Sequence, residues 1–254
     1  MMFRKLFAML AIAGVCGFSA SVASAATVQV KFDNPIFNGS GYDNVRITYP
    51  GKNLQGVSAG RFQGTVTGFA GVPASIFVDG LSDLYMYCYD VYQHIEAGKT
   101  VNYTIDLAGG MPRTLDFLGA VNSELSAGKA YDPYAWLRLY PNNAKKSASL
   151  GAAIQLGIWE SLYETHKDWD LSGGAFQATD LDSDTTTWWE KFKKAIDTTD
   201  ALDPMYVMTF KNDTYQDMIA GDPPSEVPEP GSLALLGLAL AGLAATRRNK
   251  GSAQ

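Results

Sequence analysis

The period of the hydrophobic pattern changes partway along this 254-residue chain, and this change constrains the fold more than any other feature. In the first half, apolar and polar residues alternate in short runs separated by Gly, Asn or Pro, which is the pattern of half-buried strands. The runs cover residues 27–32, 45–49, 62–69, 75–78, 84–92 and 100–105. Many short strands at this spacing favour a β-sandwich or a barrel.

The middle of the chain has helical periodicity instead. In the clearest segment, 149–163, a leucine or isoleucine recurs every four residues from Leu150 to Leu162. Residues 187–190, Thr-Trp-Trp-Glu, have the form of a capping box that opens another helix through Ile196. Short helices are also predicted at 115–125 and 135–139, and a final strand at 205–210. The sequence therefore predicts an α+β fold, with a β-sandwich or barrel body and a helical insert.

The N-terminal end has the pattern of a secretory signal peptide. Arg4 and Lys5 precede an apolar stretch to about residue 18, and residues 23–25, Ala-Ser-Ala, offer a small-residue cleavage site. We expect residues 1–25 to be removed during export, and Cys16 with them.

The C-terminal end carries a second ordered pattern, in which a Pro-Glu-Pro motif and an apolar run precede a basic cluster. The residues of the motif and the cluster are Pro228, Glu229, Pro230, Arg247 and Arg248. As a helix, the apolar run would span about 24 Å, which is short of the roughly 30 Å hydrocarbon core of a bilayer. Residues 227–250 resemble the PEP-CTERM sorting signal of Gram-negative bacteria. The resemblance implies transient insertion of a single helix in the inner membrane. It also implies removal of this tail by an exosortase-type protease, and a place on the cell surface or in the extracellular matrix.

Between these ends, residues 26–220 are the predicted ectodomain and residues 221–226 a Pro-rich linker. Residues 26–230 hold 15 Lys and Arg against 26 Asp and Glu, a net charge of −11. A surface this acidic repels nucleic acid, which excludes a nucleic-acid-binding function.

Loss of Cys16 leaves Cys88 as the single cysteine of the exported chain. Exported cysteines usually come in even numbers because they form disulfides. A lone thiol is therefore buried and inert, joined to another chain, or used for chemistry. The inert alternative is a common one, since free cysteine is among the most buried residue types.

Gln155 is the second unusual residue, because it lies in the middle of the clearest predicted helix, beside the apolar stripe. A glutamine there needs hydrogen-bond partners or it destabilises the fold. Its carboxamide either makes ordinary hydrogen bonds or no longer exists as an amide. In the second case the Cys88 sulfur attacks the side-chain carbonyl, ammonia leaves, and an internal thioester forms.

Two sequence segments carry a resemblance that bears on this choice. Residues 87–90, Tyr-Cys-Tyr-Asp, followed by residues 154–160, Ile-Gln-Leu-Gly-Ile-Trp-Glu, resemble the Cys-Gln thioester domains of bacterial surface adhesins over about residues 30–212. The resemblance implies a thioester between Cys88 and Gln155, with Asp90, Ile158 and Trp159 shaping its surroundings. It also implies single-turnover capture of an amine-bearing surface protein or matrix component, which is not enzymatic turnover.

Two other interpretations concern the histidines and an acidic loop. A cysteine hydrolase would need His94 or His166 near Cys88. The carboxylates of Asp180, Asp182 and Asp184 could hold calcium, although such a run is more often a solvated turn before a helix. Apart from calcium, no cofactor is expected.

Aromatic side chains support a last alternative. The pairs Trp136 with Tyr140 and Trp188 with Trp189 suit core packing, or a platform on which sugars stack. In the second case the protein is a non-covalent matrix or carbohydrate-binding module of the exopolysaccharide layer, and Cys88 is inert.

Overall fold

The computed structural model describes residues 25–140, 143–164 and 167–223 of the chain. Six strands close into an antiparallel barrel, in the order β1-β4-β5-β9-β8-β6. Their bounds are β1 Thr27–Phe32, β4 Phe62–Ala70, β5 Leu84–Cys88, β6 Thr100–Asp106, β8 Val207–Lys211 and β9 Met218–Gly221. The predicted α+β class and the barrel body are confirmed.

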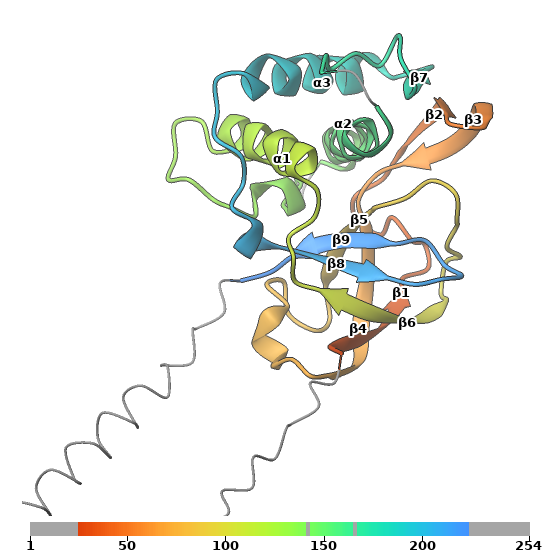
Figure 1. Cartoon of the computed structure of the whole chain (residues 1–254), viewed down its shortest axis with the longest axis vertical. Helices are drawn as coiled ribbons and strands as arrows, with labels where there is room; N and C mark the ends of the chain where they lie inside the picture. The colour runs from red at the N-terminus through yellow and green to blue at the C-terminus, as the bar shows by residue number, and fades with distance from the viewer. Residues whose placement is uncertain (1–24, 141–142, 165–166, 224–254) are drawn as a thin grey trace, which may run out of the picture.

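Two insertions extend from this barrel. The first joins β1 to β4 and forms a hairpin of β2 (Asp43–Tyr49) and β3 (Lys52–Ala59). The second joins β6 to β8, and its elements are α1 (Pro112–Leu125), α2 (Ala144–Tyr163), β7 (Gln177–Thr179) and α3 (Ser183–Ile196). Because β7 pairs with β2, the two insertions share a three-stranded sheet, β3-β2-β7. Figure 1 shows the helices grouped at one end of the barrel, with the hairpin beside them.

Helix α2 is the centre of the helical insertion. It contacts α1 and α3 within the insertion and β2, β3 and β5 outside it. Every residue from Leu150 to Ser161 is buried, as expected for a helix surrounded on all sides. Gly157 lets α1 approach closely, since a Cβ at this position would collide with the ring of Phe117.

All three described α-helices begin earlier than the sequence predicts, α1 at Pro112 and not at residue 115. The Asn143 side chain caps α2 by accepting a hydrogen bond from the Lys146 N–H (3.0 Å), so the helix starts at Ala144 and not at residue 149. The predicted capping box at Thr187 is wrong. Asp182 has the extended backbone of an N-cap, and the Thr187 hydroxyl donates instead to the Ser183 carbonyl inside the helix.

Several short elements also differ from the prediction. Residues 75–78 are not a strand, because Ala74–Ile76 forms a 3₁₀ turn. Further 3₁₀ turns cover Ala135–Leu137 and Pro204–Tyr206. Strand β5 ends at Cys88 and does not continue to residue 92, because Asp90 begins a turn. Strands β3, β7 and β9 were not predicted, since the first is polar and the other two are short.

Candidate functional site

The last residue of β5 lies directly against the middle of α2. The Gln155 Oε1 accepts a hydrogen bond from the Cys88 N–H (2.8 Å), and the Gln155 Nε2 donates to the Cys88 carbonyl oxygen (2.9 Å). The exposed fraction is 2% for Cys88 and 0% for Gln155. The fold therefore brings together two residues that are 67 positions apart, and it pairs the glutamine carboxamide with the backbone of the cysteine.

The environment of the thiol keeps it protonated. Burial raises the pKa of Cys88 well above its usual value, and the negative charge of Asp90 raises this pKa further. A neutral thiol is a weaker nucleophile than a thiolate. Any bond formation at the sulfur must therefore transfer the thiol proton in the same process.

Asp90 positions the cysteine through the backbone. Its Oδ1 accepts hydrogen bonds from the Tyr92 and Gln93 N–H groups (2.9 and 3.0 Å), and its Oδ2 accepts one from the Asp217 N–H (2.6 Å). These bonds tie the turn after β5 to the segment before β9. Cys88 itself pairs with Met218 of β9. The cysteine and the turn that follows it are therefore both attached to β9 and the residue before it.

A cleft of about 470 Å³ between the β2–β3 hairpin and the end of the barrel reaches Cys88. Trp159, Gln216 and His94 also line it. Its described lining residues include no Asp, Glu, Lys or Arg, although the ectodomain is strongly acidic. Ile158 is fully buried and does not line the cleft. Of the two histidines considered for a hydrolase, His94 shares the cleft with Cys88, and His166 lies outside the described residues.

Two further residues hold this region, and the sequence interpretation missed both. The Gln216 Nε2 donates to the Asp90 carbonyl oxygen (2.8 Å), and the Tyr163 hydroxyl accepts a hydrogen bond from the Val91 N–H (3.0 Å). Gln216 lies between β8 and β9, where no periodic pattern marks it. Tyr163 could have been found, because it continues the four-residue spacing of Gln155 and Trp159 along α2.

The three carboxylates of the acidic loop have separate surroundings. Asp180 forms an exposed ion pair with Arg46 (3.1 Å), Asp182 is the N-cap residue of α3, and Asp184 lies in its first turn, where negative charge is favourable. In the parts of the chain that the structure describes, no group of three or more His, Cys, Asp or Glu is arranged to hold a metal ion.

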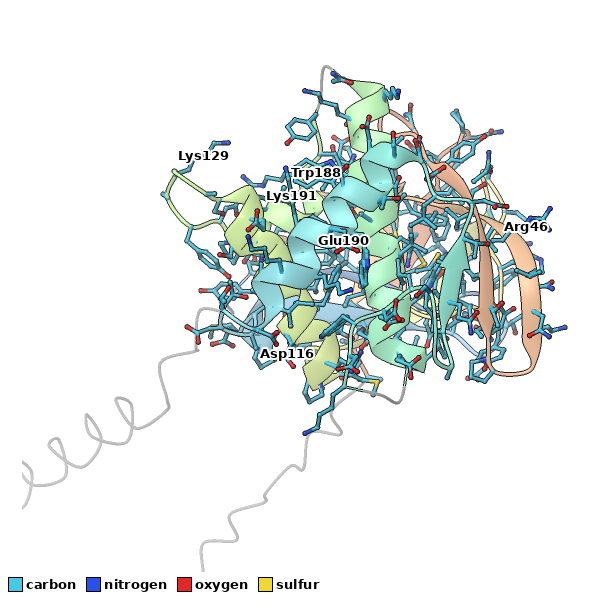
Figure 2. The ribbon with its side chains drawn as sticks, turned by 90° about the horizontal axis from the view of Figure 1, so that it is seen from above. Arg46, Asp116, Lys129, Trp188, Glu190 and Lys191 are labelled. Carbon is cyan, nitrogen blue, oxygen red and sulfur yellow. The ribbon has the colours of Figure 1, made fainter. Side chains whose placement is uncertain are left out.

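The aromatic pairs divide between core and surface. Trp136 is fully buried and stacks on Tyr87 with ring centroids 5.7 Å apart, and Trp189 is 3% exposed. Trp188 is only partly buried and lies beside Tyr140 and Lys191. Figure 2 shows Trp188 and Lys191 projecting from the outer side of α3.

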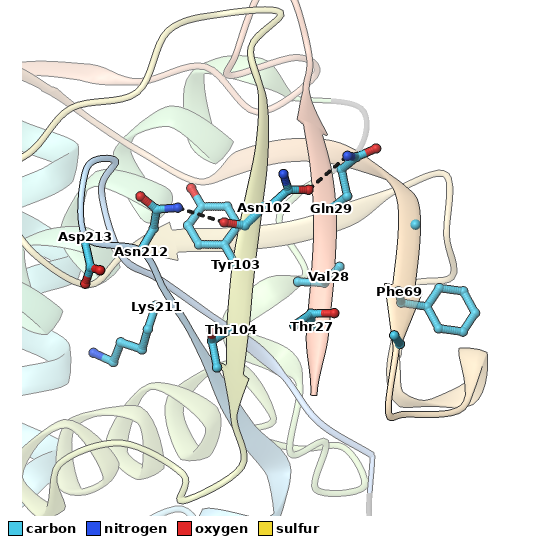
Figure 3. A pocket seen from close by; sticks show the side chains of 12 residues that line it. Thr27, Val28, Gln29, Phe69, Asn102, Tyr103, Thr104, Lys211, Asn212 and Asp213 are labelled. Carbon is cyan, nitrogen blue, oxygen red and sulfur yellow. Dashed lines mark hydrogen bonds between the residues drawn. The ribbon is translucent and has the colours of Figure 1, made fainter. Parts of the chain in front are cut away.

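A larger groove of about 560 Å³ lies on the outer surface of the barrel, along β1, β4 and β6 (Figure 3). Half of its lining residues are neutral and polar, and Lys211 and Asp213 add one charge of each sign. The Gln29 Nε2 donates to the Asn102 Oδ1 (2.9 Å), and the Asn212 Nδ2 donates to the Asn102 carbonyl oxygen (2.7 Å). None of the predicted thioester or calcium residues lines this groove.

Comparisons with known proteins bear on the C-terminal end alone. Residues 226–248 match the family described as the PEP-CTERM protein-sorting motif. No curated protein and no solved structure matches the chain. The motif indicates an exported, surface-associated bacterial protein, and processing by an exosortase is consistent with it.

The matched segment includes Pro228, Glu229, Pro230, Arg247 and Arg248, all of which lie outside the described residues together with the predicted C-terminal helix. Among the helices of the described ranges, none combines the length and the apolar character that crossing a bilayer needs.

Proposed function

We propose that the protein is a surface adhesin that carries an internal thioester between Cys88 and Gln155 and uses it to capture an amine-bearing partner covalently. In the first step the Cys88 sulfur adds to the Gln155 Cδ. The Cδ–Nε2 bond then breaks, and the leaving nitrogen departs as ammonia after taking the thiol proton. The partner is a surface protein or a matrix component that presents an amine.

The observation that carries this proposal is the pairing of the Gln155 carboxamide with Cys88 itself. The hydrogen bond from the Cys88 N–H polarises the side-chain carbonyl and places it beside the residue that would attack it. Burial of both residues supports the proposal further, because exclusion of water protects a thioester from hydrolysis.

Capture is the second step, and it consumes the thioester. A partner amine adds to the acyl carbon, the C–S bond breaks, and one amine proton passes to the sulfur. The product is an amide on the former Gln155 side chain and a free Cys88 thiol. Each chain reacts once, so the protein is not an enzyme in the usual sense. The cleft that reaches Cys88 supplies a path for the amine.

The sorting motif suggests how the protein is exported and processed before this chemistry takes place. A Gram-negative cell exports the chain, the C-terminal segment inserts transiently in the inner membrane, and an exosortase-type protease removes it. The motif match supports export and surface association, which an adhesin requires.

Intact mass spectrometry of the exported chain tests the thioester. We expect a deficit of one ammonia that disappears on treatment with methylamine, with the methylamine adduct mapped to Gln155. Cys88→Ala removes the nucleophile and should abolish both the deficit and the adduct. A wild-type mass that matches the plain sequence, with intact Gln155 and an alkylatable Cys88 after unfolding, would contradict the proposal.

A second candidate function is a non-covalent matrix or carbohydrate-binding module with an inert Cys88. Two observations favour it. Both polar atoms of the Gln155 carboxamide have hydrogen-bond partners, so an ordinary amide is satisfied there, and the raised pKa of Cys88 suits an unreactive thiol. Glycan binding that is unchanged in Cys88→Ala would support this function.

A further inference from the structure

The indole of Trp159 holds an unpaired hydrogen-bond donor. Trp159 is 3% exposed, and its buried Nε1 has no hydrogen-bond partner among the described residues. Leaving a buried donor unpaired costs roughly 1–3 kcal/mol, and such groups are rare enough in native proteins to need an explanation.

The position of Trp159 on α2 suggests an explanation for its unpaired donor. Trp159 follows Gln155 by four residues on α2, so the two side chains lie on one face of the helix. A long side chain on a helix lies back over the preceding turn, which here is the turn that holds Gln155. Trp159 also lines the cleft that reaches Cys88. The unpaired donor therefore comes from the face of α2 that carries Gln155, and from a residue that lines the cleft reaching Cys88.

The chemistry of that carbonyl group needs a second donor. In the amide state the Gln155 Oε1 already accepts one hydrogen bond, from the Cys88 N–H (2.8 Å). When a nucleophile adds to Cδ, the oxygen takes a full negative charge and binds additional donors strongly. Hydrogen-bond donors that are already fixed where this charge develops make the largest single contribution to rate enhancement in many acyl-transfer reactions.

We infer that the Trp159 indole N–H is a catalytic hydrogen-bond donor that binds the acyl oxygen of residue 155 in the tetrahedral adducts of thioester formation and amine capture. This role rests on the thioester proposed above. Together with the Cys88 N–H, the indole forms a two-donor oxyanion site built from one strand and one helix. The donor has no partner in the amide state because its acceptor charge does not yet exist.

The chain contains a matched control for this role. Trp136 is also fully buried, and its Nε1 also has no hydrogen-bond partner among the described residues. It does not line the cleft, and it stacks on Tyr87 instead. Trp159→Phe and Trp136→Phe therefore each delete one buried, unpaired indole donor, and only the first deletes it from a residue that lines the cleft.

The test is the rate at which methylamine opens the thioester of the exported chain, followed by release of the Cys88 thiol and by intact mass. We expect Trp159→Phe to react roughly 10²-fold more slowly than the wild type, as loss of one oxyanion donor does elsewhere. Trp136→Phe should react at the wild-type rate. Thermal unfolding of both variants checks that the two proteins are folded.

A second variant covers the case in which Trp159→Phe does not fold. Incorporation of 3-benzothienylalanine at position 159 replaces the indole N–H by sulfur and keeps the bicyclic shape. It should slow the reaction with methylamine as strongly as Trp159→Phe.

The outcomes separate the two proposals. A wild-type rate in the position-159 variants, or equal slowing in Trp136→Phe, would overturn the role of Trp159 and leave the thioester standing. A wild-type chain without the ammonia deficit would overturn both.

Discussion

Two faces of helix α2 bury polar side chains in different ways. On the face toward β5, the neutral Gln155 carboxamide has partners for both of its polar atoms. Five residues further along, on another face, Glu160 is also 0% exposed, yet only one carboxyl oxygen is paired. Its Oε1 accepts from the Asp170 N–H (3.2 Å) and lies 3.7 Å from Arg113, while Oε2 has no hydrogen-bond partner among the described residues.

The two groups differ because a neutral amide does not ionise, whereas burial disfavours the charged form of a carboxyl group. Burial of the incompletely paired carboxyl raises the pKa of Glu160 to about 8, so this residue is largely protonated near pH 7. The paired amide does not titrate, so its two hydrogen bonds to Cys88 do not depend on its own ionisation. One face of the helix therefore holds Gln155 against Cys88, and the other makes stability depend on pH.

Gln155→Leu should have the largest effect. The leucine leaves the N–H and the carbonyl of Cys88 without their side-chain partners in a buried site, at a cost of about 4 kcal/mol in the free energy of unfolding. Urea denaturation measures it. Gln63→Leu is the control, because Gln63 bonds to Asp83 at the exposed surface. Equal losses of unfolding free energy in the two variants would show that the buried hydrogen bonds stabilise the protein no more than the exposed one.

Glu160→Gln should have the next largest effect, and its sign depends on pH. Because the folded-state pKa of Glu160 is raised to about 8, the unfolded chain releases this proton at lower pH than the folded chain. The contribution of this group to wild-type stability should therefore be highest below pH 4.5, and it should fall by about 4 kcal/mol up to pH 8.

The glutamine does not ionise, so the variant should become more stable than the wild type at pH 8. Denaturation curves measured from pH 5 to pH 8 give the comparison. Glu190→Gln, on the outer surface of α3, is the control and should leave the pH profile unchanged (Figure 2). A wild-type profile that rises with pH in step with the variant would contradict the explanation.

Asp90→Ala should destabilise the protein by about 2 kcal/mol, because three backbone N–H groups lose a charged acceptor in a partly exposed site. Thermal or urea unfolding measures the loss. Asp106→Ala is the control, since Asp106 accepts a single backbone hydrogen bond among the described residues, from Ala108.

A second change at the same position, Asp90→Asn, should lower the pKa of the Cys88 thiol, because it removes the nearby negative charge. An unchanged pH dependence of thiol alkylation would argue against that influence.

Arg46→Ala should have the smallest effect, about 0.5 kcal/mol or less. Its ion pair with Asp180 is formed by side chains that are 57% and 64% exposed, and water competes for both charges. A double-mutant cycle with Asp180→Ala measures the coupling. A coupling free energy as large as the stability lost in Gln155→Leu would show that exposed pairs stabilise this protein as strongly as buried ones.

The sequence predicts the elements whose patterns are strong. Residues 27–32 alternate cleanly, and β1 has these bounds. Strand β3 is missed because most of its residues are exposed on the hairpin, so no alternation marks it. The start of α3 is misplaced because the Asp182 backbone provides the N-cap, which the Thr187 motif only imitates.

The residues of the candidate site also divide into those that the sequence indicates and those that it does not. The lone cysteine and the mid-helix glutamine stand out in the sequence, and the structure places them in contact. Gln216 and the incomplete pairing of Glu160 depend on which segments the folded chain brings together, so no local pattern could indicate them. The formation of the thioester stays a prediction.

The pairing of β5 with β9 also has a mechanical meaning. Cys88 ends β5, and Gly221 ends β9, the strand from which the chain leads to its sorting motif. The strands are antiparallel, with Cys88 opposite Met218 and Met86 opposite Ala220, so these two ends lie at opposite ends of the ladder. Tension between a partner held on the Gln155 side chain, which lies against the backbone of Cys88, and a C-terminal tether would load this ladder along its length. Its hydrogen bonds would share the load and would not open one at a time.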